Sequence, residues 1–299
     1  MKPLRLPPLR LRRNLTPPSR TPWGGHRIAE LKGVRVEGVV GESWEYSMEP
    51  DFPSVVEGGG PLGELVADEG LLVKLLDSQQ RLSLQIHPPH GHPDLADGEC
   101  GKHEAWVVLA SKPGAGLYVG LQPGVNEADM RAAVAAGAVE PLLNFVEVEP
   151  GDVLEVGPGT PHAVGEGLLL LEPQRLQPGH RGVTWRYWDW NRRFEGGPRT
   201  LHLEQALSVT NWGEPPPVPV RFGPPSVEGP AVRVRLVEGP VRVDRLAGSG
   251  SVDVGPGSLT VLAGSVSLDG VRAVAGETLA VRQYGAATLV RAHAVSCGA

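Results

Sequence analysis

The sequence lacks the features that define several protein classes. It has only two cysteines, Cys100 and Cys297, and no CxxC pair, which excludes a secreted disulfide framework and a cysteine-based structural zinc site. No run of about 18 apolar residues occurs, so no membrane-spanning helix is expected. The formal net charge of −6 argues against a general nucleic-acid binder. We therefore expect a cytoplasmic protein without a membrane or nucleic-acid partner.

Aromatic residues make up only 5% of the chain, whereas glycine (40 residues) and proline (30 residues) are abundant. They stand between short apolar runs, where turns between strands would lie, and this pattern disfavours a helical bundle. The composition, with 40% hydrophobic residues, allows a sizeable buried core. Strands are expected at residues 34–40, 71–76, 82–87, 106–110, 168–171 and 183–190.

Two helices are expected among these strands. The first spans 127–136, because Asn126 can cap its N-terminus, the acidic residues of its first turn suit the helix dipole, and Gly137 can end it. The second is a short helix at 202–208.

The two ends of the chain have distinct compositions. The first twenty residues are basic, and their prolines oppose both a signal-peptide core and an amphipathic transit helix, so we expect an extended arm with solvated arginines. The segment GEPPPVP at 213–219 is typical of a semi-rigid spacer. Valine-rich alternating runs follow it. We therefore expect a larger unit over 1–212 and a small all-β unit over 220–299.

Four short segments carry side chains suited to chemistry. In RLSLQIH (81–87), alternation places Ser83, Gln85 and His87 on one face, which either faces water or lines a barrel that holds a ligand. In GKHEAW (101–106), Lys102 and Glu104 share a face. They are either a solvated pair or part of a site.

The other two segments each contribute one side chain, a histidine and a carboxylate. The turn GPGTP delivers His162, and LLLLEPQ ends its apolar run on Glu172, a carboxylate that is costly to bury unpaired. In contrast, His90 and His92 lie in a loop and Cys100 has no metal-binding neighbours, so solvated rings and an inert thiol are expected there.

The segment TWRYWDWNR (184–192) combines arginines with large aromatic residues. It fits a wall around an anionic ligand, and alternation places Thr184, Arg186 and Trp188 on one face. An aromatic core strand with snorkelling arginines has the same pattern. Taken together, the histidines, the glutamate and the nearby glutamine are nitrogen and oxygen ligands, which suit a divalent metal with an open coordination position.

In order and spacing, these motifs resemble the type I mannose-6-phosphate isomerases in their short bacterial form, a family of zinc-dependent cupins. The resemblance covers about residues 3–210 and implies a mainly β cupin fold. It implies a jelly-roll-like β-barrel with a short helical insertion at about 126–137, followed by a smaller C-terminal all-β domain. The motifs that carry it are TPWGG at 21–25, GESWEYS at 41–47, QIHP at 85–88, GKHEAW at 101–106, PGTPHA at 158–163, LLLLEPQ at 168–174 and TWRYWDWNR at 184–192.

The resemblance also implies roles for individual residues and one Zn²⁺ per chain. It assigns the metal to His87, Glu104 and His162, and to Gln85, whose counterpart is a ligand in longer members. It assigns catalysis to Lys102, Glu172 and Arg186. It places Ser83 and Lys74 near the substrate phosphate.

The implied reaction interconverts mannose 6-phosphate and fructose 6-phosphate through an enediol. The general base stays open between Glu172 and Lys102. A non-catalytic cupin that binds a sugar phosphate, and an iron-dependent cupin oxygenase, are the alternatives. For the molecule we expect a monomer or weak homo-oligomer, a small sugar phosphate as its only partner, and no chemistry in 220–299.

Overall fold

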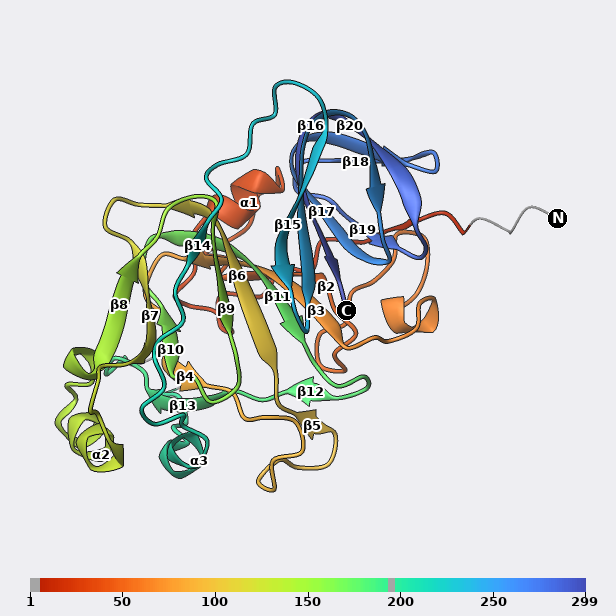
Figure 1. Ribbon diagram of the computed structural model, residues 1–299. Helices are drawn as coiled ribbons and strands as arrows, with labels where there is room; N and C mark the ends of the chain where they lie inside the picture. Colours follow the sequence, from red (N-terminus) through yellow and green to blue (C-terminus); the bar gives the residue numbers. More distant parts are fainter. Residues whose placement is uncertain (1–5, 193–196) are drawn as a thin grey trace.

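The computed structural model describes residues 6–192 and 197–299, and strands dominate it (Figure 1). Its largest unit contains two antiparallel sheets. One has six strands in the order β14 (Val220–Arg221), β9 (Asp152–Val156), β6 (His103–Ser111), β11 (Leu168–Arg175), β3 (Leu71–Ser78) and β2 (Glu42–Tyr46). The other has five, in the order β13 (Trp185–Trp188), β4 (Leu84–Ile86), β10 (His162–Val164), β7 (Gly116–Leu121) and β8 (Leu143–Glu147).

The C-terminal residues form a third, seven-stranded sheet. Its order is β1 (Leu9–Arg10), β19 (Thr278–Val281), β17 (Gly257–Leu268), β20 (Gly285–Gly298), β16 (Arg242–Val254) and β15 (Val232–Glu238), with β18 (Val271–Val274) paired to β17. A short parallel pair joins β5 (Glu99–Cys100) to β12 (Arg181–Gly182). The helices are α1 (Arg27–Leu31), α2 (Glu127–Ala136) and α3 (Leu203–Ser208), with 3₁₀ turns at Leu62–Glu64 and Glu140–Leu142.

The six- and five-stranded sheets pack face to face. Their shared core takes Trp106 from β6, Leu117 from β7 and Leu170 from β11, all fully buried. On the outer face of the five-stranded sheet, Met130 of α2 packs with Ile86 of β4, and α3 joins the same cluster. The helices therefore lie outside the sheets and leave the space between the sheets for the site.

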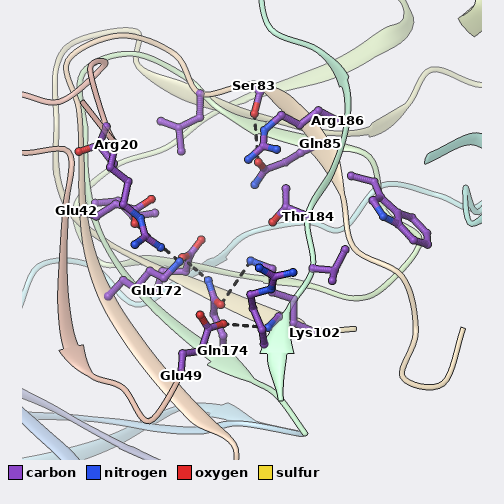
Figure 2. A pocket seen from close by; sticks show the side chains of 18 of the residues that line it. Arg20, Glu42, Glu49, Ser83, Gln85, Lys102, Glu172, Gln174, Thr184 and Arg186 are labelled. Atoms are coloured by element: carbon purple, nitrogen blue, oxygen red, sulfur yellow. Dashed lines mark hydrogen bonds and ion pairs between the residues drawn. The ribbon is translucent and has the colours of Figure 1, made fainter. Parts of the chain in front are cut away.

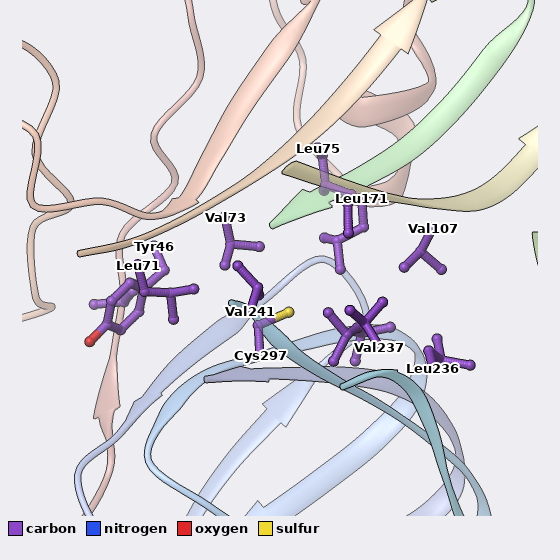
Figure 3. Packing of buried hydrophobic residues seen from close by; sticks show 14 of the residues in the cluster. Tyr46, Leu71, Val73, Leu75, Val107, Leu171, Leu236, Val237, Val241 and Cys297 are labelled. Atoms are coloured by element: carbon purple, nitrogen blue, oxygen red, sulfur yellow. The ribbon is translucent and has the colours of Figure 1, made fainter. Parts of the chain in front are cut away.

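The C-terminal unit covers the outer face of the six-stranded sheet. Figure 3 shows Val73 and Leu171 of that sheet facing Val237, Val241 and Cys297 of the C-terminal unit, and all five belong to one buried cluster. A polar contact adds to this core, because Lys32 donates a hydrogen bond to the Gly276 carbonyl over 2.9 Å. The two units are thus joined by a continuous core.

The expected mainly β fold class is confirmed, with one correction. In the described residues, the strands of the larger unit form two separate sheets, so the jelly-roll is not a closed barrel. The division at 212 to 220 stays a prediction. The spacer at 213–219 has neither helix nor strand, and β14 directly after it pairs with β9 in the larger unit.

Several local expectations can be compared with the structure. The helix at 127–136 is confirmed, with Asn126 as its N-cap and Gly137 at φ 67° ending it, and the second helix is confirmed as α3. The strand expected at 34–40 is wrong, because only Val40 makes a bridge, to Gly25. The strands expected at 82–87 and 183–190 are shorter, as β4 and β13.

The N-terminal arm is more tightly held than expected. Leu9 and Arg10 pair with β19. Arg10 also forms ion pairs with Glu57 and Glu277, so the expectation of solvated arginines is wrong for this residue.

Both cysteines are buried and free, as an inert thiol at Cys100 requires. Within the described residues, no helix has the length and apolar character needed to cross a membrane.

Candidate metal centre and its pocket

A buried cluster of three side chains lies between the two sheets. His87 follows β4, Glu104 lies on β6 and His162 begins β10. Their candidate ligand atoms all lie within 4.8 Å of one another, and each side chain is almost fully buried. The Nε2 atom of His87 lies 3.2 Å from Glu104 Oε1, and Nε2 of His162 lies 3.7 Å from Glu104 Oε2. The structure therefore brings together three of the four residues expected to bind metal.

Each histidine is oriented by a contact on its far side. Nδ1 of His87 lies 3.0 Å from the Val183 carbonyl, and Nδ1 of His162 lies 2.9 Å from the Thr160 carbonyl. A carbonyl accepts a hydrogen bond, so the proton resides on Nδ1 and the Nε2 lone pair points into the cluster. Such outer contacts are typical of metal-binding histidines, because they fix the tautomer and the ring orientation.

The ionisation states also suit a cation. Burial lowers the pKa of His87 to about 3 and lowers that of His162 as well, so both rings stay neutral near pH 7. Burial alone would raise the pKa of Glu104, but the neighbouring His87 and Lys102 outweigh it and hold the pKa well below its usual range. Metal ligands must be deprotonated, and all three are.

The cluster also leaves polar atoms without partners. Among the described residues, His87 Nε2 and both carboxylate oxygens of Glu104 accept no well-directed hydrogen bond. Lys102 Nζ lies 2.8 Å from Glu104 Oε1 and forms an ion pair with it. Buried polar atoms are seldom left unpaired, so the donor set fits a divalent metal that these two histidines and the glutamate would hold.

Gln85, the fourth expected ligand, lies beside the cluster. It pairs with His162 in the β4–β10 ladder, and its amide nitrogen lies 3.3 Å from His162 Nε2. Its oxygen accepts a hydrogen bond from Ser83 Oγ over 3.3 Å. Rotation of this amide by about half a turn would bring the oxygen toward the cluster. The expected alternation is present from Ser83 onward, since Ser83 and Gln85 line the pocket and Leu84 and Ile86 pack under the helices. It is wrong for Leu82, which lines the pocket as well.

Glu172 and Lys102 lie next to the cluster on the six-stranded sheet. Glu172 on β11 accepts hydrogen bonds from Trp106 Nε1 over 3.0 Å and from the Gln174 amide. Burial, followed by the charge of Glu104, raises the pKa of Glu172 to about 7. Lys102 Nζ also lies 3.5 Å from Gln174 Oε1. Hence two buried carboxylates with opposite pKa shifts lie side by side.

Beside the metal cluster, Gln85, Lys102 and Glu172 line one cavity of about 580 Å³ (Figure 2). Lys74, paired in register with Glu172, lines it together with Ser83 and Arg186. Lys74 Nζ lies 3.9 Å from Glu42 Oε2 and 4.4 Å from the centre of the Trp44 ring. All nine residues expected at the site thus lie in the cluster or along this cavity.

Other residues of the site were not expected from the sequence. Gln174 and Trp106 could have been found, because each stands two positions from an expected residue on the same strand face. Arg20, Glu49 and Arg199 come from irregular segments, where no periodic pattern assigns a direction to the side chain.

Comparisons with known proteins agree with this geometry. No protein-family model matches the chain. A mannose-6-phosphate isomerase from Streptococcus mutans is 34% identical over 211 residues, which cover 64% of this chain and 65% of that protein. The mannose-6-phosphate isomerase ManA of Bacillus subtilis is 31% identical over 217 residues, covering 67% of this chain and 66% of that protein. The matched segments thus span slightly less than two thirds of these relatives.

Solved structures extend the similarity of fold to the whole chain. The mannose 6-phosphate isomerase of Bacillus subtilis superposes with a TM-score of 0.80 at 22% identity, covering 98% of this chain and 100% of that one. A putative mannosephosphate isomerase from Archaeoglobus fulgidus gives a TM-score of 0.74 at 21% identity, covering 99% of each chain. The expected cupin-like fold is therefore confirmed, and the sequence matches identify the lineage: the chain belongs to the type I mannose-6-phosphate isomerase family.

Proposed function

We propose that the protein is a metal-dependent aldose–ketose isomerase that interconverts mannose 6-phosphate and fructose 6-phosphate. The observation that carries this proposal is the buried His87–Glu104–His162 cluster, whose candidate ligand atoms lie within 4.8 Å of one another beside a cavity that also holds Glu172. The names of the related proteins support the same activity.

Zinc is the metal that we propose for this site, with one ion per chain. Two neutral histidines and one carboxylate match the donor set of catalytic zinc sites. A mannose 6-phosphate isomerase described as zinc-bound has the same fold, with a TM-score of 0.65. When bound, zinc supplies Lewis-acid stabilisation of the negative charge that develops on the substrate oxygens. Gln85 would add a fourth ligand through its amide oxygen.

Glu172 is the better of the two candidates for the general base. Its pKa of about 7 suits a group that accepts and returns a proton near neutral pH. Lys102 is held in an ion pair with Glu104, and an ammonium group has no lone pair with which to accept a proton. Lys102 and Arg186 instead supply positive potential along the cavity.

The proton transfer is balanced within the substrate. Glu172 takes the proton from C2 of the open-chain aldose and returns it to C1, while a hydroxyl proton moves from O2 to O1. The carbonyl thereby moves from C1 to C2 without an oxidant or reductant. Trp106 and Gln174 hold the Glu172 carboxylate in a fixed position through their hydrogen bonds.

A coupled assay for fructose 6-phosphate tests the proposal. The purified protein should convert mannose 6-phosphate, elemental analysis should find one equivalent of zinc, and a chelator should abolish turnover in a way that added zinc reverses. Zinc-loaded protein that binds mannose 6-phosphate without turning it over would favour the non-catalytic cupin. An active preparation without stoichiometric metal would overturn the metal dependence.

A further inference from the structure

The backbone directly after β12 orients one of the expected metal ligands. Nδ1 of His87 lies 3.0 Å from the Val183 carbonyl, which accepts its proton and leaves Nε2 facing Glu104. Val183 follows β12, the short strand that runs parallel to β5. The orientation of the His87 ring therefore depends on what holds the backbone at residues 182 and 183.

Gly182 lets this backbone pass close to two side chains. A Cβ atom at residue 182 would lie 2.7 Å from Leu176 Cδ2 and 3.2 Å from Lys102 Cδ, both closer than ordinary contacts. Glycine allows such an approach, but it also gives the backbone more conformational freedom than any other residue. The segment that orients His87 thus contains a flexible residue and needs a restraint from elsewhere in the chain.

Glu49 supplies this restraint. Its Oε1 accepts a hydrogen bond from the Gly182 N–H over 2.9 Å, and the Val183 N–H donates to the Cys100 carbonyl over 2.9 Å. A hydrogen bond to a carboxylate is stronger than one between neutral groups. The two bonds hold the backbone at two consecutive residues, immediately before the carbonyl that meets His87.

The turn that carries Glu49 is itself well held. It follows β2, and Glu49 is only 7% exposed. The Glu49 N–H donates to Ser47 Oγ over 3.2 Å, and its carbonyl accepts from the Phe52 N–H over 3.2 Å. The Ser54 N–H donates to the Ser47 carbonyl over 2.8 Å and closes the turn. The carboxylate of Glu49 is therefore a fixed anchor for Gly182.

Glu49 also places a charge at the wall of the cavity. Figure 2 shows it near Lys102, and Gly182 lies against both, because a Cβ there would be 3.5 Å from Glu49 Oε1. Burial lowers the pKa of Lys74, but the charges of four carboxylates, Glu49 among them, outweigh burial and raise it. Glu49 can thus act through its charge or through its hydrogen bond. Of these two, the hydrogen bond leads along the backbone to His87.

We propose that Glu49 is a positioning residue for the metal site, which acts on His87 through Gly182 and Val183. The inference rests on the proposed function, in which His87 binds zinc. Loss of an outer contact to a metal-binding histidine typically lowers metal affinity or activity by about 10- to 100-fold. Glu49 acts one step further from the ring than the Val183 carbonyl, so we expect an effect at the low end of this range.

Zinc affinity, measured by competition with a chromophoric chelator, tests the assignment. Glu49→Ala removes the acceptor and should weaken zinc binding by about tenfold. Glu49→Gln keeps an amide oxygen for the Gly182 N–H and should bind zinc nearly as tightly as the wild type. Glu64→Ala is the matched control, because Glu64 is exposed and does not line the cavity, and it should leave zinc affinity unchanged.

The visible spectrum of the Co²⁺-substituted protein gives a readout that a purely structural role would not change. Its d–d bands report the geometry of the ligands, so Glu49→Ala should shift them, whereas Glu49→Gln and Glu64→Ala should keep the wild-type spectrum. Gly182 lines the cavity, so water can solvate its N–H in Glu49→Ala, and the metal-free variant should remain folded.

Three results would overturn the proposal. The first is wild-type zinc affinity and a wild-type Co²⁺ spectrum in Glu49→Ala. The second is a lower Tm of metal-free Glu49→Ala with both metal readouts unchanged, which indicates a purely structural role. The third is equally weakened zinc binding in Glu49→Ala and Glu49→Gln, because the charge rather than the hydrogen bond would then be responsible.

These measurements need no substrate, so they separate the inference from the proposed function. If the wild type binds zinc but does not isomerise mannose 6-phosphate, the proposed isomerase is wrong. Zinc binding weakened about tenfold in Glu49→Ala alone would still support the role of Glu49. If the wild type isomerises the substrate and Glu49→Ala binds zinc equally tightly, only the inference fails. A wild type that binds no zinc would overturn the inference together with the metal assignment.

Discussion

At the scale of single residues, the two buried carboxylates of the site show how environment assigns roles. Glu104 faces His87 and Lys102, which hold its pKa low despite burial, so it stays charged and can hold a metal. For Glu172, burial and the charge of Glu104 outweigh the effect of Lys74 and Lys102, so its pKa rises to about 7. Environments that push the pKa values of two acids apart are typical of acid–base catalysis.

Replacement of Glu172 tests this division of roles. Glu172→Gln keeps the shape and an acceptor for Trp106 but removes the base, so kcat should fall about 100- to 10,000-fold. Zinc content and Tm should stay close to wild type, because Glu172 is outside the proposed ligand set. Glu166→Gln changes an exposed residue before β11 and is the control, which should leave kcat, zinc content and Tm unchanged. Near-normal turnover in Glu172→Gln would remove Glu172 from the catalytic residues.

His293 makes the stability of the protein depend on pH. It lies on β20 between Ala247 and Ala263, and burial, followed by the charge of Arg245, lowers its pKa to about 4. Between about pH 6.5 and pH 4 the unfolded chain binds a proton that the folded chain does not. Stability should therefore fall as the pH decreases through this range, by roughly 3 kcal/mol in all.

Urea unfolding at about pH 7.5 and about pH 5 measures this effect. His293→Gln should lose less stability between the two pH values than the wild-type protein does. The buried histidines of the metal site contribute equally to both proteins, so the difference isolates His293. Equal pH dependence in the two proteins would show that His293 does not titrate in this way.

At the scale of secondary-structure elements, the sequence correctly predicted those segments in which hydrophobic and polar residues alternate regularly or in which clear helix-cap residues occur. Alternation in 81–87 correctly separated the face of β4 under the helices from the face toward the pocket. Asn126 and Gly137 correctly predicted the two ends of α2. In contrast, 34–40 alternates valine with polar residues but makes no ladder, because no neighbouring strand pairs with it in the described residues.

The site residues that were not predicted come from irregular segments, in which hydrophobic and polar residues do not alternate. Nothing in the local sequence around Arg20 or Arg199 shows that these arginines meet at one cavity, because that contact joins residues far apart in the chain. Likewise, pairing of β1 with β19 depends on where the C-terminal unit docks. Local pattern fixes which face a strand residue occupies, whereas the partners across a cavity are set by the tertiary fold.

The N-cap of α2 gives a prediction for one element. Asn126 Oδ1 accepts hydrogen bonds from the N–H groups of Ala128 and Asp129 over 2.9 and 3.2 Å, and Asp129 accepts one in return. Asn126→Ala should lower the free energy of unfolding by about 1 kcal/mol, whereas Asn126→Ser should keep most of it. Turnover should not change, because α2 packs on the sheet face away from the site. Urea midpoints that are equal for all three proteins would contradict the prediction.

At the scale of the whole molecule, the outer face of the six-stranded sheet is buried by the C-terminal unit. Alternate residues of β11 face opposite ways, so Leu171 packs against that unit while Glu172 lines the cavity. None of the described residues beyond His202 lines the cavity. We therefore expect residues 220–299 to stabilise the sheet that carries the site and to take no part in the chemistry.

A buried ion pair lies at the junction of the two units. Lys32 Nζ lies 2.8 Å from Glu45 Oε1, and the side chains of both residues are only 2% exposed. Each also contacts the C-terminal unit, Lys32 through the Gly276 carbonyl and Glu45 through the Thr278 hydroxyl, which donates to it over 2.6 Å. The pair thus links α1, β2 and the C-terminal sheet across their interface.

Removal of one partner leaves the other charge buried and unpaired, so Lys32→Met should lower the free energy of unfolding by about 3–5 kcal/mol. In the double variant Lys32→Met/Glu45→Gln no charge is left unpaired, and the Thr278 hydroxyl keeps an acceptor. The double variant should therefore be more stable than Lys32→Met alone. Neither residue lines the cavity, so kcat should stay near wild type in both variants while they are folded. Urea unfolding of the wild type, Lys32→Met, Glu45→Gln and the double variant gives a double-mutant cycle for this ion pair. Equal stability of Lys32→Met and the wild type, or additive losses in the double variant, would show that this pair does not hold the units together.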